Sequence, residues 1–208
     1  RHEAGNGPLA DPSEAMGGSI QEPDGSIGDG GHAGHGDVLV AEADESDGSF
    51  LKYRPDIAIV TNAEADHLDH YGTALKYRAA FVRYVAHAAK RVIICGDDEG
   101  ALAVIRASDA HVGARMVVYT TQSAQRLGDV HGAQVVRITS ENESAGTGYE
   151  RFTVRIPAQV FGTESELAVP MALRIPGIHN ARNATAAVLA AIDLGMEPSA
   201  AADAASTF

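Results

Sequence analysis

The stretch Asp37-Val38-Leu39-Val40-Ala41-Glu42-Ala43-Asp44-Glu45-Ser46-Asp47-Gly48-Ser49-Phe50 decides the expected fold. Its apolar run at residues 38–41 is continuous rather than alternating, which is typical of a strand buried on both faces of a parallel sheet. Four acids within the next six residues follow this run directly. Because open α/β sheets bind ligands at the carboxyl ends of their strands, the sequence predicts a functional site at residues 42–47.

A second unit repeats this plan. Residues 56–60 read Asp-Ile-Ala-Ile-Val, and Thr61-Asn62-Ala63-Glu64-Ala65-Asp66-His67-Leu68-Asp69-His70-Tyr71-Gly72 follows them. The residues between the two predicted strands are sufficient for a short crossover connection. Two parallel strands therefore deliver acids, an imidazole and small polar groups to one edge of the sheet, where we expect the active site.

Strand and helix patterns alternate over the next part of the chain. They predict a helix from Thr73 to about residue 89, a strand at 90–96, a helix from Asp97 to about residue 107 and a strand at 116–119. Such alternation predicts an α/β fold, with a mostly parallel, doubly wound sheet flanked by helices.

The pattern changes after residue 130. Segments 135–138, 151–156 and 167–175 alternate apolar with polar residues, which predicts a small antiparallel subsheet with one solvated face. A helix is then predicted between Pro176 and Gly195, because apolar residues recur there at spacings of three and four.

Composition limits the class of protein. The 208 residues are 45% apolar, which is sufficient for one large domain, and no apolar run approaches the length of a membrane span. The N-terminus is polar and Gly-rich, unlike a signal peptide. A single cysteine, Cys95, excludes a disulfide framework, so we expect a reducing, cytoplasmic setting.

The net charge of −12 argues against nucleic acid as a partner, because phosphate backbones are bound by clustered Lys and Arg. Residues 42–69 contain eight acids against Lys52 and Arg54, a net charge of −6. A solvated acidic surface is one interpretation. The position of these acids at predicted strand ends favours a site instead, and such a site would repel a polyphosphate unless divalent cations lay between them.

Three separated motifs carry a resemblance to a known family. They are Glu42-Ala43-Asp44-Glu45-Ser46-Asp47, Thr61-Asn62-x-x-x-Asp66-His67-x-Asp69 and Pro176-Gly177-x-His179-Asn180-x-x-Asn183-Ala184. In this order they resemble the central, P-loop-NTPase-like domain of the Mur ligases, over roughly residues 13–208. The resemblance implies an ATP-dependent ligase of peptidoglycan synthesis, which activates a carboxylate as an acyl phosphate for attack by an amine.

Within the family, the motifs are most similar to the ligases that join L-alanine to the carboxylate of UDP-N-acetylmuramate. Ser46 supports this choice, because the related ligase that recycles cell-wall tripeptides carries tyrosine at the matching place. The resemblance therefore implies UDP-N-acetylmuramate and L-alanine as small-molecule partners, with neither nucleic acid nor a membrane.

The resemblance also assigns metal ligands. It implies that Glu42 holds one Mg²⁺ and His67 a second, and that ATP is bound beside them. Asp66 is expected to be catalytic, and either Asp66 or Asp69 would fix the His67 tautomer. The competing interpretations are a structural carboxylate at Glu42 and a core histidine at His67.

Two further groups follow from the resemblance. The residues expected to face the sugar nucleotide, the reacting carboxylate or phosphate are Asp44, Glu45, Ser46, Asp47, Thr61 and Asn62. The residues expected to contact the nucleotide are His179, Asn180 and Asn183. An Asn amide can both donate to and accept from the adenine edge, whereas ordinary N-capping is the alternative for Asn180.

The chain departs from the family in one respect. A P-loop ends in Gly-Lys-Thr or Gly-Lys-Ser, but none of the three lysines, Lys52, Lys76 and Lys90, follows a glycine. We therefore expect residues 1–208 to be a central ATP-binding domain that lacks its first strand, its P-loop and the N- and C-terminal ligase domains. Residues 1–12 are interpreted as a cloning remnant or a divergent junction.

Three alternatives stay open. The first is another Mur-type ligase, for tripeptide recycling or a later stem-peptide step. The second is a degenerate, non-catalytic binding module, which the missing P-loop favours. The third is an unrelated metallohydrolase, which leaves the segment His179-Asn180-x-x-Asn183 without a role.

Overall fold

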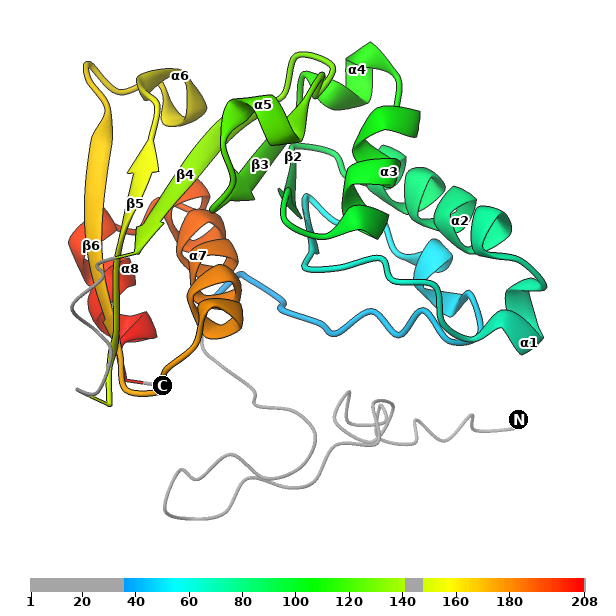
Figure 1. Ribbon diagram of the computed structural model, residues 1–208, viewed down its shortest axis with the longest axis horizontal. Helices are drawn as coiled ribbons and strands as arrows, with labels where there is room; N and C mark the ends of the chain where they lie inside the picture. Colours follow the sequence, from blue (N-terminus) through cyan, green and yellow to red (C-terminus); the bar gives the residue numbers. More distant parts are fainter. Residues whose placement is uncertain (1–35, 141–147, 208) are drawn as a thin grey trace, which may run out of the picture. The chain divides into compact units, whose positions relative to one another are not determined.

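The structure is a computed structural model that describes residues 36–140 and 148–207 (Figure 1). The interpretation of residues 1–12 lies outside this part of the chain. Contacts divide the chain after Glu42. The unit that begins at Ala43 contains all the helices and strands described below, and residues 36–42 are considered by themselves.

The described residues form one six-stranded sheet in the order β1-β2-β3-β4-β5-β6. Its strands are β1 (Ile57–Val60), β2 (Arg91–Cys95), β3 (Met116–Thr120), β4 (Gln134–Ser140), β5 (Glu150–Ile156) and β6 (Leu167–Leu173). Strands β1 to β4 are parallel, and β5 is antiparallel to both β4 and β6. The predicted α/β fold is confirmed, and the antiparallel strands continue the parallel sheet.

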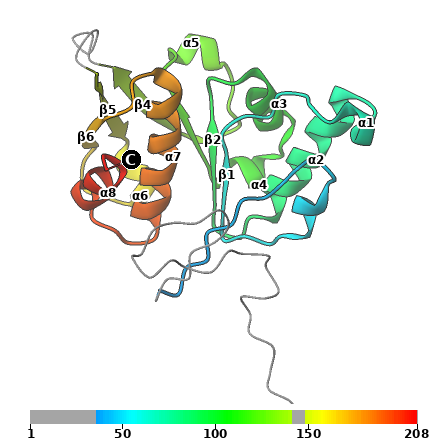
Figure 2. The same cartoon turned by 90° about the horizontal axis from the view of Figure 1, so that it is seen from below.

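Helices cover both faces of this sheet. They are α1 (Leu68–Tyr71), α2 (Ala74–His87), α3 (Glu99–Ala107), α4 (Ala110–Gly113), α5 (Ala124–Leu127), α6 (Ala158–Phe161), α7 (Ile178–Asp193) and α8 (Pro198–Ala205), with a 3-10 turn η2 (Ser49–Lys52). Figure 2 shows α2 and α3 on one face of the sheet and α7 and α8 on the other. The doubly wound arrangement is therefore confirmed. Within the described ranges, no helix has the length and apolar character needed to cross a membrane.

The sequence of β2 is apolar from Val92 to Cys95 because helices cover both faces of this strand. Val92 and Ile94 belong to the core formed with α2 and α3, whereas Ile93 and Cys95 belong to the core formed with α7. Successive side chains of a strand point to opposite faces. The part of the strand that helices cover on both sides, Val92 to Cys95, is therefore apolar throughout.

Residues 38–41 do not form a strand, so that prediction is wrong. Val38, Leu39 and Val40 are 55%, 77% and 89% exposed. A buried parallel strand needs hydrogen-bonded neighbours, and no strand of the described chain pairs with this segment. The apolar run alone does not supply that pairing.

The observed first residues of α2 and α3 lie within two residues of the starts predicted from the sequence. Thr73 caps α2 as predicted, because its hydroxyl oxygen accepts from the Lys76 N–H at 3.2 Å. Helix α3 begins at Glu99, and its N-cap is Asp98 rather than Asp97. The carboxylate of Asp97 does not cap α3 and contacts Thr121 and Arg182 instead.

Candidate functional site

The carboxyl ends of three parallel strands define one edge of the sheet. Thr61 follows β1, Asp97 lies two residues after β2, and Thr121 follows β3. Because these strands are parallel, their ends meet on the same side, where α/β proteins bind ligands. Helix α7 reaches this edge through an ion pair between Arg182 and Asp97.

The acidic segment is shaped by its own carboxylates. Asp44 Oδ1 accepts from the Ser46 N–H at 2.8 Å, and Asp47 Oδ1 accepts from the Ser49 N–H at 2.8 Å. Hydrogen bonds from Ser46 lower the pKa of Asp44, and hydrogen bonds from Ser49 lower the pKa of Asp47. These two acids therefore stabilise local turns. Their predicted contact with substrate stays a prediction.

Glu45 connects this segment to His67. Its Oε1 lies 3.7 Å from His67 Nε2, and both side chains are about one-third exposed or more. The Tyr71 hydroxyl donates to the Glu45 carbonyl oxygen. Burial raises the pKa of Tyr71, and the nearby acids Glu45 and Asp47 raise it further, so this hydroxyl stays protonated as a donor. The structure thus brings together two predicted site residues from different motifs.

The backbone at His67 is unusual. Its φ of 49° is left-handed, a region that is uncommon for residues other than Gly, although His, Asn and Asp enter it more often than the rest. Asp66 Oδ1 accepts from the His67 N–H at 2.7 Å. Asp66 therefore fixes the backbone of His67. In the described part of the chain, the His67 ring makes no hydrogen bond to Asp66 or Asp69, and the carboxylate that lies nearest the ring belongs to Glu45.

The role of His67 as a magnesium ligand stays a prediction, and Glu45 is the carboxylate that lies beside its ring. No group of three or more His, Cys, Asp or Glu side chains within residues 36–140 and 148–207 is placed to hold a metal. Mg²⁺ needs no such cage, because it usually keeps several waters and is bound through one or two carboxylates together with substrate phosphates. Glu42 is exposed and belongs to the preceding unit, so its role as a ligand stays a prediction.

The loop after β1 is held by α3. Thr61 and Asn62 are exposed, and the next residue, Ala63, is buried. Asp98 Oδ1 accepts from the Ala63 N–H at 2.9 Å while it also caps α3 by accepting from the Ala101 N–H at 2.7 Å. One carboxylate thus positions the loop that presents Thr61 and Asn62.

Asp97 holds a second set of contacts at the same edge. Its carboxylate accepts from the hydroxyls of Thr120 and Thr121 and from the Thr121 N–H, and its Oδ2 lies 2.7 Å from Arg182 Nε. Burial acts to raise the pKa of Asp97, but the hydrogen bonds from Thr120 and Thr121 and the charge of Arg182 outweigh it and hold that pKa low. Asp97 is therefore a buried, ionised carboxylate that joins three elements.

The start of α7 is fixed by a third carboxylate. The N-cap Gly177 has φ 118°, which is accessible to Gly, and its N–H donates to Glu150 Oε2 at 3.1 Å. Asn180 lies within the helix and donates its amide to the Pro176 carbonyl oxygen at 3.0 Å, so the N-cap interpretation of Asn180 is wrong. His179 and Asn183 are exposed, as a ligand contact would require.

Sequence reasoning missed Asp97, Glu150 and Arg182. For Asp97 the signal was present, because it follows a continuous apolar strand just as the acids after residue 41 follow an apolar run. Glu150 and Arg182 carry no such signal, since their partners are remote in sequence.

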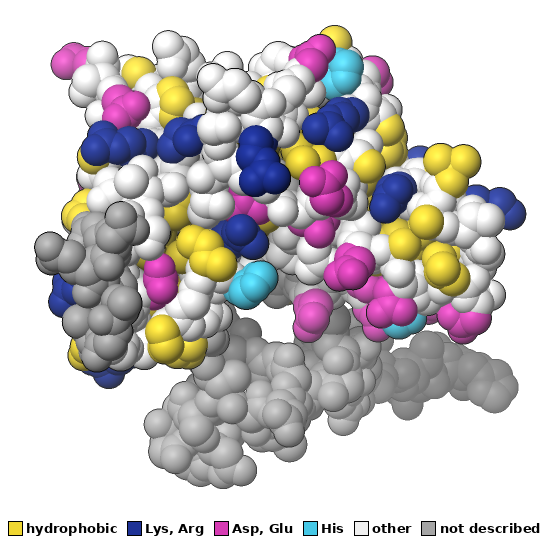
Figure 3. All heavy atoms as spheres, in the orientation of Figure 1, with side chains coloured by type: hydrophobic (Ala, Val, Ile, Leu, Met, Phe, Trp, Pro, Cys, Tyr) yellow, Lys and Arg dark blue, Asp and Glu magenta, His cyan; other side chains and the backbone are white. Residues whose placement is uncertain are grey.

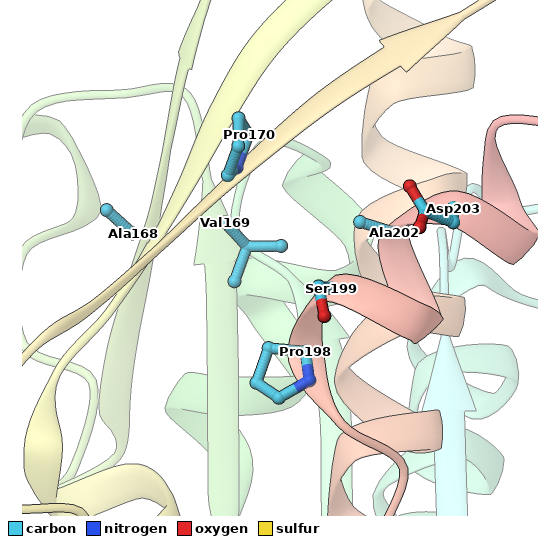
Figure 4. A pocket seen from close by; sticks show the side chains of 7 residues that line it. All are labelled: Ala168, Val169, Pro170, Pro198, Ser199, Ala202 and Asp203. Atoms are coloured by element: carbon cyan, nitrogen blue, oxygen red, sulfur yellow. The ribbon is translucent and has the colours of Figure 1, made fainter.

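The acidic residues of the chain are unevenly distributed over its surface. Figure 3 shows acidic side chains gathered on the part of the molecule that carries η2 and α1. A separate groove of about 370 Å³ lies between β6 and α8, and Figure 4 shows its lining. The lining residues are Ala168, Val169, Pro170, Pro198, Ser199, Ala202 and Asp203. None of them is a predicted site residue, so the groove is distinct from the carboxyl edge.

Comparison with known sequences gives consistent matches. Residues 33–191 match the family described as Mur ligase middle domain. The chain is 62% identical over 205 residues to a UDP-N-acetylmuramate–L-alanine ligase of Bifidobacterium adolescentis, covering 99% of this chain and 39% of that protein. It is 41% identical over 189 residues to the ligase of the same name from Renibacterium salmoninarum, covering 90% and 35%. The chain thus spans well under half the length of these relatives.

A solved structure supports the fold. The UDP-N-acetylmuramate–alanine ligase of Thermotoga maritima superimposes with a TM-score of 0.54 at 23% identity, covering 80% of this chain and 32% of that one. At this identity the likeness concerns the fold alone.

Proposed function

Because this chain belongs to the Mur ligase middle domain family, we propose that it is the central ATP-binding domain of a ligase that joins L-alanine to UDP-N-acetylmuramate. The observation that carries the proposal is the identity of 62%, over nearly the whole chain, to a ligase of that name. Ser46 lies in the motif that favours this ligase over the tripeptide-recycling one. The flanking ligase domains belong to the full-length protein in this proposal.

The reaction requires a carboxylate to be phosphorylated by ATP and then attacked by an amine. Transfer of a phosphoryl group depends mainly on positioning and on neutralising charge. One Mg²⁺ held by His67, with Glu45 beside the imidazole, and a second held by Glu42 would supply that neutralisation. The negative charge of the acidic segment would otherwise oppose the phosphates.

The other residues of the edge bind and orient in this proposal. Thr61 and Asn62 present hydroxyl and amide groups at the end of β1, where they can donate to phosphate or water. His179 and Asn183 are exposed on the first turns of α7, where they can contact the nucleotide base. The Asn180 side-chain amide donates one hydrogen to the Pro176 carbonyl oxygen. Its own carbonyl oxygen and its second amide hydrogen are therefore available to the base.

We place the protein in the cytoplasm, as a part of peptidoglycan synthesis that determines cell shape and division. A nucleotide-linked sugar and ATP are the proposed substrates, and the single cysteine, Cys95, is buried and unpaired. The unpaired thiol suits a reducing compartment.

The test is phosphate release by the full-length protein supplied with ATP, Mg²⁺, UDP-N-acetylmuramate and L-alanine. We expect release that depends on all four and that falls when a cell-wall tripeptide replaces L-alanine. The isolated 208-residue chain is the matched control and should release no phosphate, since it has no Gly-Lys-Thr segment to hold the β- and γ-phosphates. A full-length protein without turnover would favour the degenerate binding module instead.

A further inference from the structure

Two ion pairs join β2 to α7. At the start of β2, the Nη2 and Nε of Arg91 lie 2.7 Å and 3.0 Å from Asp193 Oδ1, at the last residue of α7. Past the end of β2, Asp97 Oδ2 lies 2.7 Å from the Nε of Arg182, in the second turn of α7. Each arginine side chain is 22% exposed. Arg91 donates two hydrogen bonds to Asp193, whereas the Arg182 Nε contact with Asp97 is an ion pair without an aligned hydrogen bond. The helix is therefore held near both of its ends by an ion pair.

The two pairs differ in what surrounds them. Arg91 and Asp193 lie at the amino end of β2, away from the strand ends that carry the candidate site. Asp97 lies at the carboxyl edge, and its carboxylate also accepts from Thr121 N at 3.1 Å and from Thr121 Oγ1 at 2.6 Å. This second pair therefore joins α7 to the ends of two strands.

Arg182 immediately precedes Asn183 and follows Asn180 by two residues. Within a helical turn the backbone is rigid, so the position of one residue determines the direction of its neighbours' side chains. The same segment is also held at Gly177, whose N–H donates to Glu150 Oε2. The direction of Asn180 and Asn183 is therefore set by contacts with the sheet at both ends of segment 177–183.

We propose that Asp97 is a positioning residue for nucleotide binding, which acts through Arg182 to orient the turn of α7 that carries Asn180 and Asn183. This inference depends on the proposed function, because it assumes that this turn contacts the nucleotide. Asp97 itself touches no ligand, since its side chain is fully buried. Its effect must therefore reach the nucleotide through the helix.

The experiment compares variants of the full-length protein at the two pairs. Asp97→Asn keeps the size of the side chain and removes its charge, and Asp193→Asn is the matched control at the other end of the same helix. Thermal unfolding measures stability, binding of a non-hydrolysable ATP analogue gives the nucleotide Kd, and initial rates separate KM for ATP from kcat.

We expect both single variants to unfold at a lower temperature than the wild type. Only Asp97→Asn should raise the nucleotide Kd and the KM for ATP, by about tenfold, the lower end of the loss that follows removal of a partner that orients a metal ligand. The KM for UDP-N-acetylmuramate should change less than about twofold, since the removed contact orients the nucleotide turn only.

A double variant, Asp97→Asn with Arg182→Met, separates positioning from stability. Removing both charges of a buried pair often leaves stability unchanged, so this variant should unfold near the wild-type temperature and still bind the ATP analogue weakly. Wild-type affinity in the double variant, or an equal loss of affinity in Asp193→Asn, would overturn the positioning role. A wild-type protein that binds no nucleotide would instead overturn the proposed function, and the inference with it.

Discussion

Gly100 and Ala63 approach so closely that a Cβ atom on Gly100 would lie 2.0 Å from the Ala63 carbonyl oxygen. Gly100 is in the first turn of α3, and Ala63 is in the loop after β1. Only the absence of a side chain allows the helix and the loop to pack at this distance. The loop presents Thr61 and Asn62, so this contact bears on the candidate site as well as on stability.

Gly100→Ala should therefore destabilise the protein, although alanine favours helix. A side chain forced into a packed contact typically costs about 1–3 kcal/mol, more than the roughly 1 kcal/mol that alanine gains over glycine in a helix. Urea unfolding measures the change. Gly36→Ala is the control, since a Cβ there meets nothing within 4 Å. Equal stability of the two variants would contradict the close packing.

Asp98 and Asp109 offer a comparison of two helix caps. Each accepts from a backbone N–H three residues later, at 2.7 Å in α3 and 2.9 Å in α4, but only Asp98 also accepts from Ala63 N. We expect Asp109→Ala to cost about 1 kcal/mol, the usual value of a cap. Asp98→Ala should cost roughly 1 kcal/mol more, because a second hydrogen bond is lost.

The same two variants also test the loop after β1. In the full-length protein, Asp98→Ala should lower kcat/KM, because the loop that presents Thr61 and Asn62 loses its anchor. Asp109→Ala should keep the wild-type kcat/KM. If both variants lower it alike, the loop anchor has no part in the activity.

Acid should destabilise the protein partly through Asp97. Its pKa in the folded state is lowered from 3.8, so the unfolded state binds a proton more readily. The ionised carboxylate therefore contributes stability that is complete above the unfolded pKa and is lost as pH falls through the folded pKa. Burial raises the pKa of the neighbouring Cys95 and Tyr119, so both are neutral in this range.

Urea unfolding between about pH 5 and pH 2 measures this contribution. The wild-type midpoint should fall with acid, and that of Asp97→Asn should fall less steeply, because one linked proton is removed. Identical slopes would mean that Asp97 is not held ionised by Thr120, Thr121 and Arg182.

His67 and Glu42 are predicted metal ligands, and each can be tested by substitution in the full-length protein. His67→Ala and Glu42→Ala should each lower kcat by about a hundredfold or more, since a metal at a transferring phosphoryl group contributes several kcal/mol. Exposed residues of the same type, changed as His111→Ala and Glu164→Ala, are the controls and should leave the rate unchanged.

The effect of magnesium concentration completes this test. If the two residues bind Mg²⁺, the activity that remains in each variant should saturate at a higher concentration of Mg²⁺ than in the wild type. Wild-type rates at saturating Mg²⁺ in both variants would refute the assignment of these residues as ligands.

Periodicity predicted most of the fold because its signals are local. The continuous apolar run of β2 and the alternation in β5 each follow from which faces are covered, and both strands form where they were expected. The run at residues 38–41 is continuously apolar, as Val92 to Cys95 of β2 are, but it forms no strand. Its failure shows that an apolar run becomes a strand only when neighbouring strands pair with it.

The candidate site was predicted less completely. The pairing of Glu45 with His67 joins two motifs that the sequence had already marked. The partner of the His67 ring was expected to be Asp66 or Asp69, yet the Asp66 carboxylate contacts the His67 backbone instead. Sequence spacing cannot distinguish these contacts, because they depend on the left-handed φ at His67.

By itself, the sequence determined the layers of this protein and the motifs that identify its family. These follow from periodicity and residue type, which act over a few neighbouring residues. Only the tertiary structure decided that Asp97 contacts Arg182 and that Glu150 contacts Gly177. Those pairs join residues that are distant along the chain, and their contacts exist only after the helices have packed on the sheet.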